Sequence, residues 1–262
     1  LAALMGVLSS VERMGVGAWG AWSAPAVIAA TLLAGSGVGL INGLLITIGR
    51  VPSIVATLGM LTILRGTTEV VMGGKWITDL PPAIRALGTG GAVGIPWCIW
   101  AAAVVAAVTL FIARRTPLGL RIYAVGGNPE AAAAARISTR RVKLLAFTFV
   151  GLCTAIAALV TVPQQSVIES GIGAGFELVV VTAVVVGGTS IRGGYGGIAG
   201  TILAALLLGS IRTTLIFLRL GDVGTYWERA IHGAFILAAV LADHFAMRAF
   251  ASRSTQSAGA AA

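Results

Sequence analysis

The glycine-rich stretch 188–194 is the part of this chain that comes nearest to nucleotide chemistry. It reads GTSIRGG, whereas a phosphate-binding loop needs G-x-x-x-x-G-K-[ST], whose lysine and hydroxyl contact the phosphates and magnesium. The lysine and the following hydroxyl are missing here, so we predict that the chain does not bind nucleotide in this way. The sequence also contains neither G-x-S-x-G nor H-E-x-x-H. We therefore predict no catalytic residue and no enzymatic activity.

The residue types that bind metals are sparse and scattered. The two histidines, His232 and His244, are expected near the two ends of one helix, too far apart to share a metal ion. Cys98 and Cys153 both fall inside apolar runs and are interpreted as small buried hydrophobic residues rather than as a disulfide or metal pair. The sequence thus predicts no metal site.

The loop 114–143 carries the clearest concentration of charge. It contains a single acid, Glu130, and seven basic residues. The basic residues are Arg114, Arg115, Arg121, Arg136, Arg140, Arg141 and Lys143. Within the loop, Asn128 is a good helix cap, Pro129 suits the first helical position, and Glu130 favours the positive end of a helix dipole. We predict a short exposed helix that continues through the run Ala131 to Ala135.

Two interpretations of this loop stay open at this point. A basic loop between apolar segments is retained on the cytoplasmic side of a membrane, and many such loops have no further role. A helix displayed there can also present a surface to a soluble partner.

The elements around this loop are those of a polytopic membrane protein. Hydrophobic residues make up 57% of the 262 residues and charged residues only 10%, which excludes an ordinary water-soluble domain. A membrane-spanning helix needs about 20 apolar residues. Long charge-free runs occupy 14–49, 51–64, 86–113, 144–168, 178–191, 193–211 and 230–242. They predict an all-α protein with about seven crossings and a single transmembrane domain over 1–262.

Charge placement orients these crossings. With 114–143 inside, alternation puts 69–85 and 164–177 outside, 190–197 with Arg192 inside, 217–227 outside, and the tail with Arg248 and Arg253 inside. The apolar part of 178–188 is short and could be re-entrant. We favour a crossing, because otherwise both tail arginines would lie outside.

Glycine spacing predicts where helices pack closely. Gly35, Gly39 and Gly43 lie four residues apart, and Gly196, Gly200 and Ala204 repeat this spacing.

The polar candidates for a translocation path are uncharged and lie in or near the predicted helices: Asn42, Thr57, Thr62, Gln164 and Gln165. The net charge of +9 does not point to nucleic acid, since the basic residues cluster beside membrane segments.

Three motifs resemble one family. The string GGNPEAAAAARI, with RTPLGLRIYAV before it and RVK after it, resembles the cytoplasmic coupling loop of ABC importer permeases for ribose, xylose, rhamnose and autoinducer-2. That family usually reads GGN-x-EAA-x-x-SGI, and Arg136 and Ile137 stand where Ser/Ala-Gly-Ile is commoner. The stretches 171–201 and 41–66 also resemble the family. The residues matching its second glycine signature are Glu177, Gly187, Gly188, Thr189, Ser190, Gly193, Gly194 and Gly200.

The resemblance implies a permease subunit in a bacterial inner membrane, in contact with lipid. The implied partners are an ATPase subunit that binds ATP and magnesium, a second permease subunit, and a periplasmic or lipid-anchored binding protein. No cofactor is expected in this chain. The implied ATPase-coupling residues are Gly126, Gly127, Asn128, Pro129, Glu130, Ala131 and Ala132. Because such permeases usually have around ten helices, an N-terminally shortened form is expected.

The expected substrate is a monosaccharide, with rhamnose or autoinducer-2 suggested by the segment 73–81. A branched-chain amino-acid permease is the alternative, although its coupling loop usually lacks the string found at 126–130. A secondary transporter is a further alternative, but it normally needs an intramembrane carboxylate. Glu177, at a segment edge, is the one acid placed for such a role.

Overall fold

The structure is a computed structural model that describes residues 23–74, 76, 82–92, 94–169, 171–190, 193–217, 227, 230, 231, 233–235, 237 and 238. Several predictions concern features outside these residues: the start of the run 14–49, most of the runs 217–227 and 230–242, most of the segment 73–81, Arg192, His232, His244, Arg248 and Arg253.

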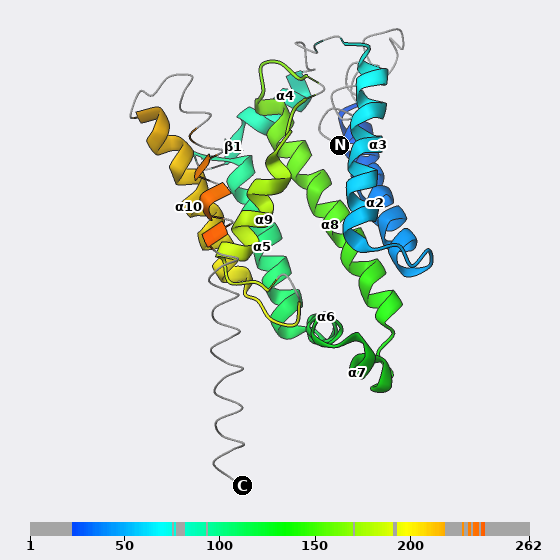
Figure 1. The fold of residues 1–262 in the computed structure, drawn as a ribbon. Helices are drawn as coiled ribbons and strands as arrows, with labels where there is room; N and C mark the ends of the chain where they lie inside the picture. Colours follow the sequence, from blue (N-terminus) through cyan, green and yellow to red (C-terminus); the bar gives the residue numbers. More distant parts are fainter. Residues whose placement is uncertain are drawn as a thin grey trace. The chain divides into compact units, whose positions relative to one another are not determined.

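The described chain is mostly helical, as predicted (Figure 1). Its helices are α2 (Ser23–Thr47), α3 (Ser53–Met72), α4 (Pro82–Thr89), α5 (Trp97–Arg115), α6 (Pro117–Gly127), α7 (Pro129–Ala134), α8 (Thr139–Thr161), α9 (Phe176–Val186) and α10 (Ile198–Phe217). A 3-10 turn, η2 (Val162–Gln164), follows α8, and β1 (Gly91–Ala92) pairs with β2 (Ile95–Pro96) in an antiparallel hairpin.

Four of the described helical segments are long and apolar enough to cross a membrane: Pro25–Thr47, Ser53–Met72, Trp97–Arg115 and Thr139–Gln164. Helix α9 has 11 residues. At 1.5 Å per residue it is about 16 Å long, roughly half the thickness of a bilayer core. The predicted crossing at 178–188 is therefore not among the four spans, and the count of seven crossings stays a prediction.

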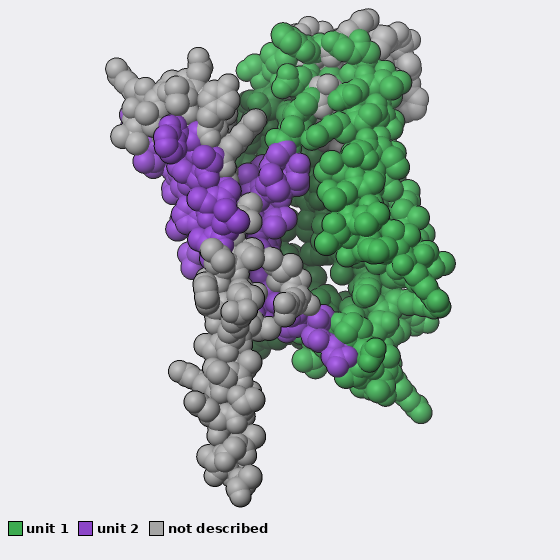
Figure 2. Space-filling model, viewed as in Figure 1, with its two compact units in different colours: residues 1–125, 129–174 green, residues 126–128, 175–262 purple. Residues whose placement is uncertain are grey.

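The chain divides into two compact units, coloured in Figure 2. The first unit contains residues 1–125 and 129–174, and the second contains 126–128 and 175–262. Each unit is described below by itself.

Close packing of α2 against α8 dominates the first unit, and it confirms the glycine spacing predicted at 35, 39 and 43. A Cβ atom added at Gly35 would lie 2.6 Å from Cβ of Ala155, and one at Gly39 would overlap the carbonyl oxygen of Phe147. Gly43 lies against Leu144. As the numbers rise in α2 they fall in α8, so the two helices are antiparallel. The turn 48–52 and the loop 114–143 therefore lie at the same end of this unit.

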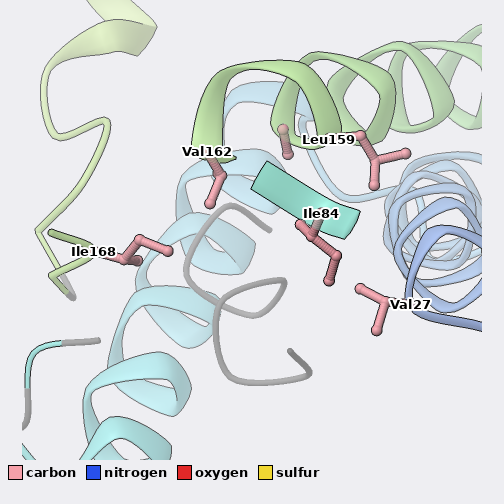
Figure 3. Packing of buried hydrophobic residues seen from close by; sticks show 6 residues of the cluster. Val27, Ile84, Leu159, Val162 and Ile168 are labelled. Atoms are coloured by element: carbon pink, nitrogen blue, oxygen red, sulfur yellow. The ribbon is translucent and has the colours of Figure 1, made fainter. Parts of the chain in front are cut away.

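The opposite end of the first unit is held by a small apolar cluster (Figure 3). Ile84 of α4 and Ile168 are both fully buried, and they pack with Val27 of α2 and Val162 of η2. Helix α4 comes close to η2, where a Cβ atom at Gly88 would lie 2.8 Å from Cβ of Pro163. Residues 82–85 of one loop predicted to lie outside, and residues 164–168 of the other, therefore lie at this end of the first unit, away from 114–143.

In the second unit α9 and α10 form an antiparallel pair around another close glycine contact. A Cβ atom at Gly187 would lie 2.5 Å from the backbone nitrogen of Thr201, and one at Gly200 would overlap the carbonyl oxygen of Gly187. The hydroxyl groups of Thr189 and Thr201 lie 3.5 Å apart beside this contact. The described residues 187–190 and 193–197 therefore lie in a tight reversal of the chain between the two helices.

Candidate functional site

The candidate coupling segment begins where α5 ends. Thr116 is extended, as expected for a residue that precedes proline, and Pro117 starts α6. Gly119 permits the sharp reversal, because a Cβ atom there would lie 2.5 Å from the carbonyl oxygen of Ile112. In Figure 1, α6 is seen end-on whereas α5 and α8 run lengthwise, so α6 lies across the direction of both helices.

Helix α7 starts where the sequence predicts. Its first residue is Pro129, directly after Asn128, and Glu130 lies exposed in the first turn. Proline needs no backbone N–H donor at this position, and a carboxylate near a helix N-terminus is favourable. The local sequence is thus sufficient to explain this end of the helix.

The other end of α7 is closed by a Schellman motif. The backbone N–H of Ile137 donates to the carbonyl oxygen of Ala132 at 3.0 Å, and that of Arg136 donates to Ala133, also at 3.0 Å. These are the two bonds that satisfy the last free carbonyls of a helix. The residue between the helix and Ile137 must adopt the left-handed conformation, which usually requires glycine.

Arg136 takes this left-handed position, with φ of 59°. The pattern of the resembling family places glycine here, which is the residue that this conformation favours. A left-handed backbone costs a residue with a Cβ atom about 1–2 kcal/mol relative to glycine. The chain tolerates this conformation because the motif around it is complete.

A small apolar seat lies under α7, and it overturns part of the prediction for this helix. Val125 of α6, Ala132 of α7 and Val142 of α8 are 4%, 4% and 7% exposed, and Ile137 packs against them. Ala132 is therefore a buried contact and does not belong to an exposed turn, as the alanine run suggested. The reason is tertiary: three helices converge on this one alanine. The helix also ends at Ala134 rather than Ala135.

The charged side chains point outward from this seat. All seven basic residues of the loop 114–143 are exposed: Arg114, Arg115, Arg121, Arg136, Arg140, Arg141 and Lys143. Glu130, Ala131 and Ala133 of α7 are exposed as well. The segment thus combines an apolar underside with a strongly basic outer surface.

The second unit contains a contact between two glycine pairs that are distant in the sequence. A Cβ atom at Gly193 would lie 2.6 Å from the carbonyl oxygen of Gly126, and one at Gly194 would lie 2.7 Å from Cα of Gly127. Gly193 and Gly194 also have φ of 92° and 87°. The backbones touch directly, which only residues without Cβ atoms permit. Both pairs lie in motifs that are recognisable from the sequence, but the sequence does not show that they meet.

The remaining residues of the second signature shape the loop and the helix ends. Glu177 lies exposed in the first turn of α9, where its charge suits the helix dipole. Gly188 has φ of 82°, and the backbone N–H of Ser190 donates to the carbonyl oxygen of Tyr195 at 3.1 Å. Gly188 and Ser190, together with Gly187, Thr189 and Gly200, build the turn between α9 and α10.

The candidate path residues are not gathered in one place. Thr57 is half-buried and Thr62 exposed on α3, and both hydroxyls donate to backbone carbonyls of that helix. Gln164 and Gln165 are exposed at the end of α8 opposite the coupling segment. Asn42 lies next to Gly43, toward the coupling end, and its Oδ1 atom is buried with no hydrogen-bond partner. These positions do not define a common binding site within the described residues.

Among the described residues, no group of three His, Cys, Asp or Glu side chains could hold a metal ion.

The known proteins that this chain resembles are permease components of transport systems. A family described as "Branched-chain amino acid transport system / permease component" matches residues 1–240. The ribose import permease protein RbsC of Haemophilus influenzae is 37% identical over 223 residues, which cover 84% of this chain and 68% of that protein. The L-arabinose ABC transporter permease protein AraH of Azospirillum brasilense is 35% identical, covering 83% of this chain and 63% of that protein.

The autoinducer 2 import system permease protein LsrC of Escherichia coli is 33% identical, covering 85% of this chain and 64% of that protein. No solved structure matches the chain.

Proposed function

The chain belongs to this family of transport-system permease components, and we propose that it is the transmembrane permease subunit of a bacterial ABC importer for a monosaccharide. Membership in the family and the apolar helices make it an integral membrane protein. Permease components are not enzymes, which confirms the prediction that the chain has no enzymatic activity.

The observation that carries this proposal is the construction of the coupling segment. Helix α7 is a short helix whose C-terminal end is closed by a complete Schellman motif and whose buried alanine rests on α6 and α8. A loop that only retains positive charge in the cytoplasm does not need a capped and seated helix. A helix that receives force from a soluble partner does need one, because a frayed helix would yield before its neighbours moved.

The partners follow from this role. A separate ATPase subunit binds ATP and magnesium and docks on the segment formed by Gly126, Gly127, Asn128, Pro129, Glu130, Ala131 and Ala132. Ala132 supports this surface from below, since it is buried. A second permease subunit completes the pathway, and a periplasmic or lipid-anchored binding protein delivers the substrate. The whole chain forms one transmembrane domain in the inner membrane, with about seven crossings.

The substrate class is a sugar, with rhamnose or a related sugar or autoinducer-2 as the specific candidates. The relatives named above import ribose, arabinose or autoinducer-2, although the family description speaks of branched-chain amino acids. Sugars are bound by uncharged hydrogen-bonding groups, and Asn42 offers a buried oxygen without a partner. Asn42, Thr57, Thr62, Gln164 and Gln165 remain the path candidates.

Uptake by the reconstituted importer tests the proposal. The chain is combined in proteoliposomes with the ATPase and binding protein encoded beside it. Accumulation of labelled ribose, arabinose, rhamnose, autoinducer-2 and leucine is then measured with ATP and magnesium inside. We expect uptake of one of the sugars or autoinducer-2 that stops when the ATPase carries an inactive phosphate-binding lysine.

Two outcomes would contradict the proposal. Uptake of leucine but of no sugar would assign the chain to amino-acid import. Uptake that needs a proton or sodium gradient and no ATP would make it a secondary transporter.

A further inference from the structure

Four exposed basic residues lie where α2 ends and α8 begins, and all of them belong to the first unit. They are Arg50, Arg140, Arg141 and Lys143, which we call the rim cluster. Gly43 lies against Leu144 and the two helices are antiparallel, so Thr47 is level with the start of α8. The turn that follows Thr47 and carries Arg50 therefore lies at the same end of the unit as the basic start of α8 (Figure 1).

Exposed apolar side chains begin directly beside the rim cluster. Ile48, two residues before Arg50, is 70% exposed. Leu145, which is 54% exposed, follows Arg141 by four residues and is its neighbour on the surface of α8. The surface thus changes from cationic to apolar within one helical turn, about 5.4 Å. A water-soluble partner would match only the cationic part of this surface, whereas a phospholipid matches both parts.

The described acids of the first unit do not balance this charge. Glu69 lies 16 residues after the start of α3, about 24 Å along that helix and away from Arg50. Glu169 adjoins Ile168, in the apolar cluster at the opposite end of the unit. Of the described acids in this unit, only Glu130 is left at the end that holds Arg50 and the seven basic residues of the loop 114–143. The counter-charge is therefore expected from outside the chain.

The backbone at Arg50 shows that this charge is placed at a disfavoured position. Arg50 has φ of 54°, and the N–H of the next residue, Val51, donates to the carbonyl oxygen of Leu45 at 3.4 Å. This is a helix end at which glycine is the usual residue. Retention of a loop on one side of the membrane needs positive charge nearby, but it does not need a side chain in the left-handed conformation.

We propose that the rim cluster binds the phosphate group of an anionic phospholipid, such as phosphatidylglycerol, whose acyl chains lie along the exposed apolar side chains beside the cluster. Arginine forms paired, charge-assisted hydrogen bonds with phosphate, and each basic residue near the membrane surface adds to the attraction of anionic lipid. In phosphatidylcholine a cationic headgroup neutralises the same phosphate, so the site distinguishes the two lipids. The proposal needs only a membrane-spanning chain and does not depend on sugar import.

Fluorescence quenching measures which lipid lies beside the cluster. Bimane is attached through Leu145→Cys in the full chain, after Cys98→Ala and Cys153→Ala remove the native thiols. The chain is placed in phosphatidylcholine nanodiscs that contain increasing fractions of either phosphatidylglycerol or phosphatidylcholine with a nitroxide near the top of one acyl chain. Because nitroxides quench bimane only at close range, the two quenching curves give the relative binding of the two lipids at this position.

The test variants are Arg141→Gln and Arg50→Gly. Arg50→Gly removes the charge and also relieves the left-handed backbone, so a weakened turn cannot explain its effect. Arg50→Lys keeps the positive charge at the same position. Arg85→Gln is the matched control, because it removes an equally exposed charge from α4, at the opposite end of the first unit.

We expect phosphatidylglycerol to be preferred in the original chain and in Arg85→Gln, and to remain preferred in Arg50→Lys. In each test variant the preference should fall about fivefold, the change expected for one basic residue beside an anionic headgroup. If Arg141→Gln does not fold, Arg50→Gly decides the result.

Equal quenching by the two lipids in the original chain would overturn the proposal, as would an equal loss of preference in Arg85→Gln. If the original chain shows no lipid preference and Arg141→Gln weakens binding of the purified ATPase subunit instead, the rim cluster docks a protein and the lipid site is refuted. If the lipid preference is found but no ATPase binds, the proposed import function fails while the lipid site stands.

Discussion

Replacing Arg136 with glycine should leave the end of α7 more stable than replacing it with alanine does. Arg136 holds φ of 59° at the position of a Schellman motif where glycine is the usual residue. Arg136→Gly removes the Cβ atom that crowds this conformation. It also removes a positive charge that is favourable near a helix C-terminus, so the comparison must be made with Arg136→Ala, which loses the same charge and keeps the Cβ atom.

The expected difference between the two variants follows from two opposing effects. The left-handed conformation costs a residue with a Cβ atom about 1.5 kcal/mol, and the extra freedom of glycine in the unfolded chain offsets about 0.7 kcal/mol of this gain. Arg136→Gly should thus be more stable than Arg136→Ala by about 0.8 kcal/mol. Local opening of the motif then becomes about fourfold rarer.

Hydrogen–deuterium exchange of the peptide that spans α7 gives the direct measurement. The amide of Ile137 is protected by its bond to Ala132, so its exchange reports opening of the motif. We expect slower exchange in Arg136→Gly than in Arg136→Ala, with exchange in α2 the same in both. Equal or faster exchange in Arg136→Gly would show that the backbone at this position is not held in the left-handed conformation, and the account of the helix end would be wrong.

Three further predictions concern packing and orientation. Ala132→Asp should unseat α7, because an unpaired charge in this apolar seat costs several kcal/mol; limited proteolysis of the loop should then accelerate, whereas the exposed Ala133→Asp should cause no change. Gly39→Ala should lower the thermal midpoint through a clash of about 1–3 kcal/mol with α8. Gly37→Ala, which meets no atom within 4 Å, should not lower it, and equal effects would refute the close α2–α8 contact. Ser138→Cys should resist labelling by an impermeant reagent added outside intact cells, and labelling there would reverse the proposed topology.

The sequence alone determined the features that depend on neighbouring residues or on the apolar length of a segment. The segments now seen as α5 and α8 were recognisable because a run of apolar side chains long enough to span a bilayer needs no tertiary partner to favour a helix. Helix α3 was predicted only in part, because it continues past Arg65 and Glu69 to Met72, beyond the charge-free run 51–64. The start of α7 was predictable because proline and glutamate act within one turn. The glycine stripe of α2 was recognisable because its four-residue spacing places every member on one helix face.

Tertiary structure decided which of several chemically identical residues is buried and which distant segments meet. The alanines that follow Glu130 have the same side chain, and Ala132 differs from Ala131 and Ala133 only because α6 and α8 converge on it. Glycine motifs indicate that a close approach is possible, but they do not specify the partner. Gly193 meets Gly126 because the turn between α9 and α10 brings their backbones together, and a residue without a side chain carries no signal that could identify such a partner in advance.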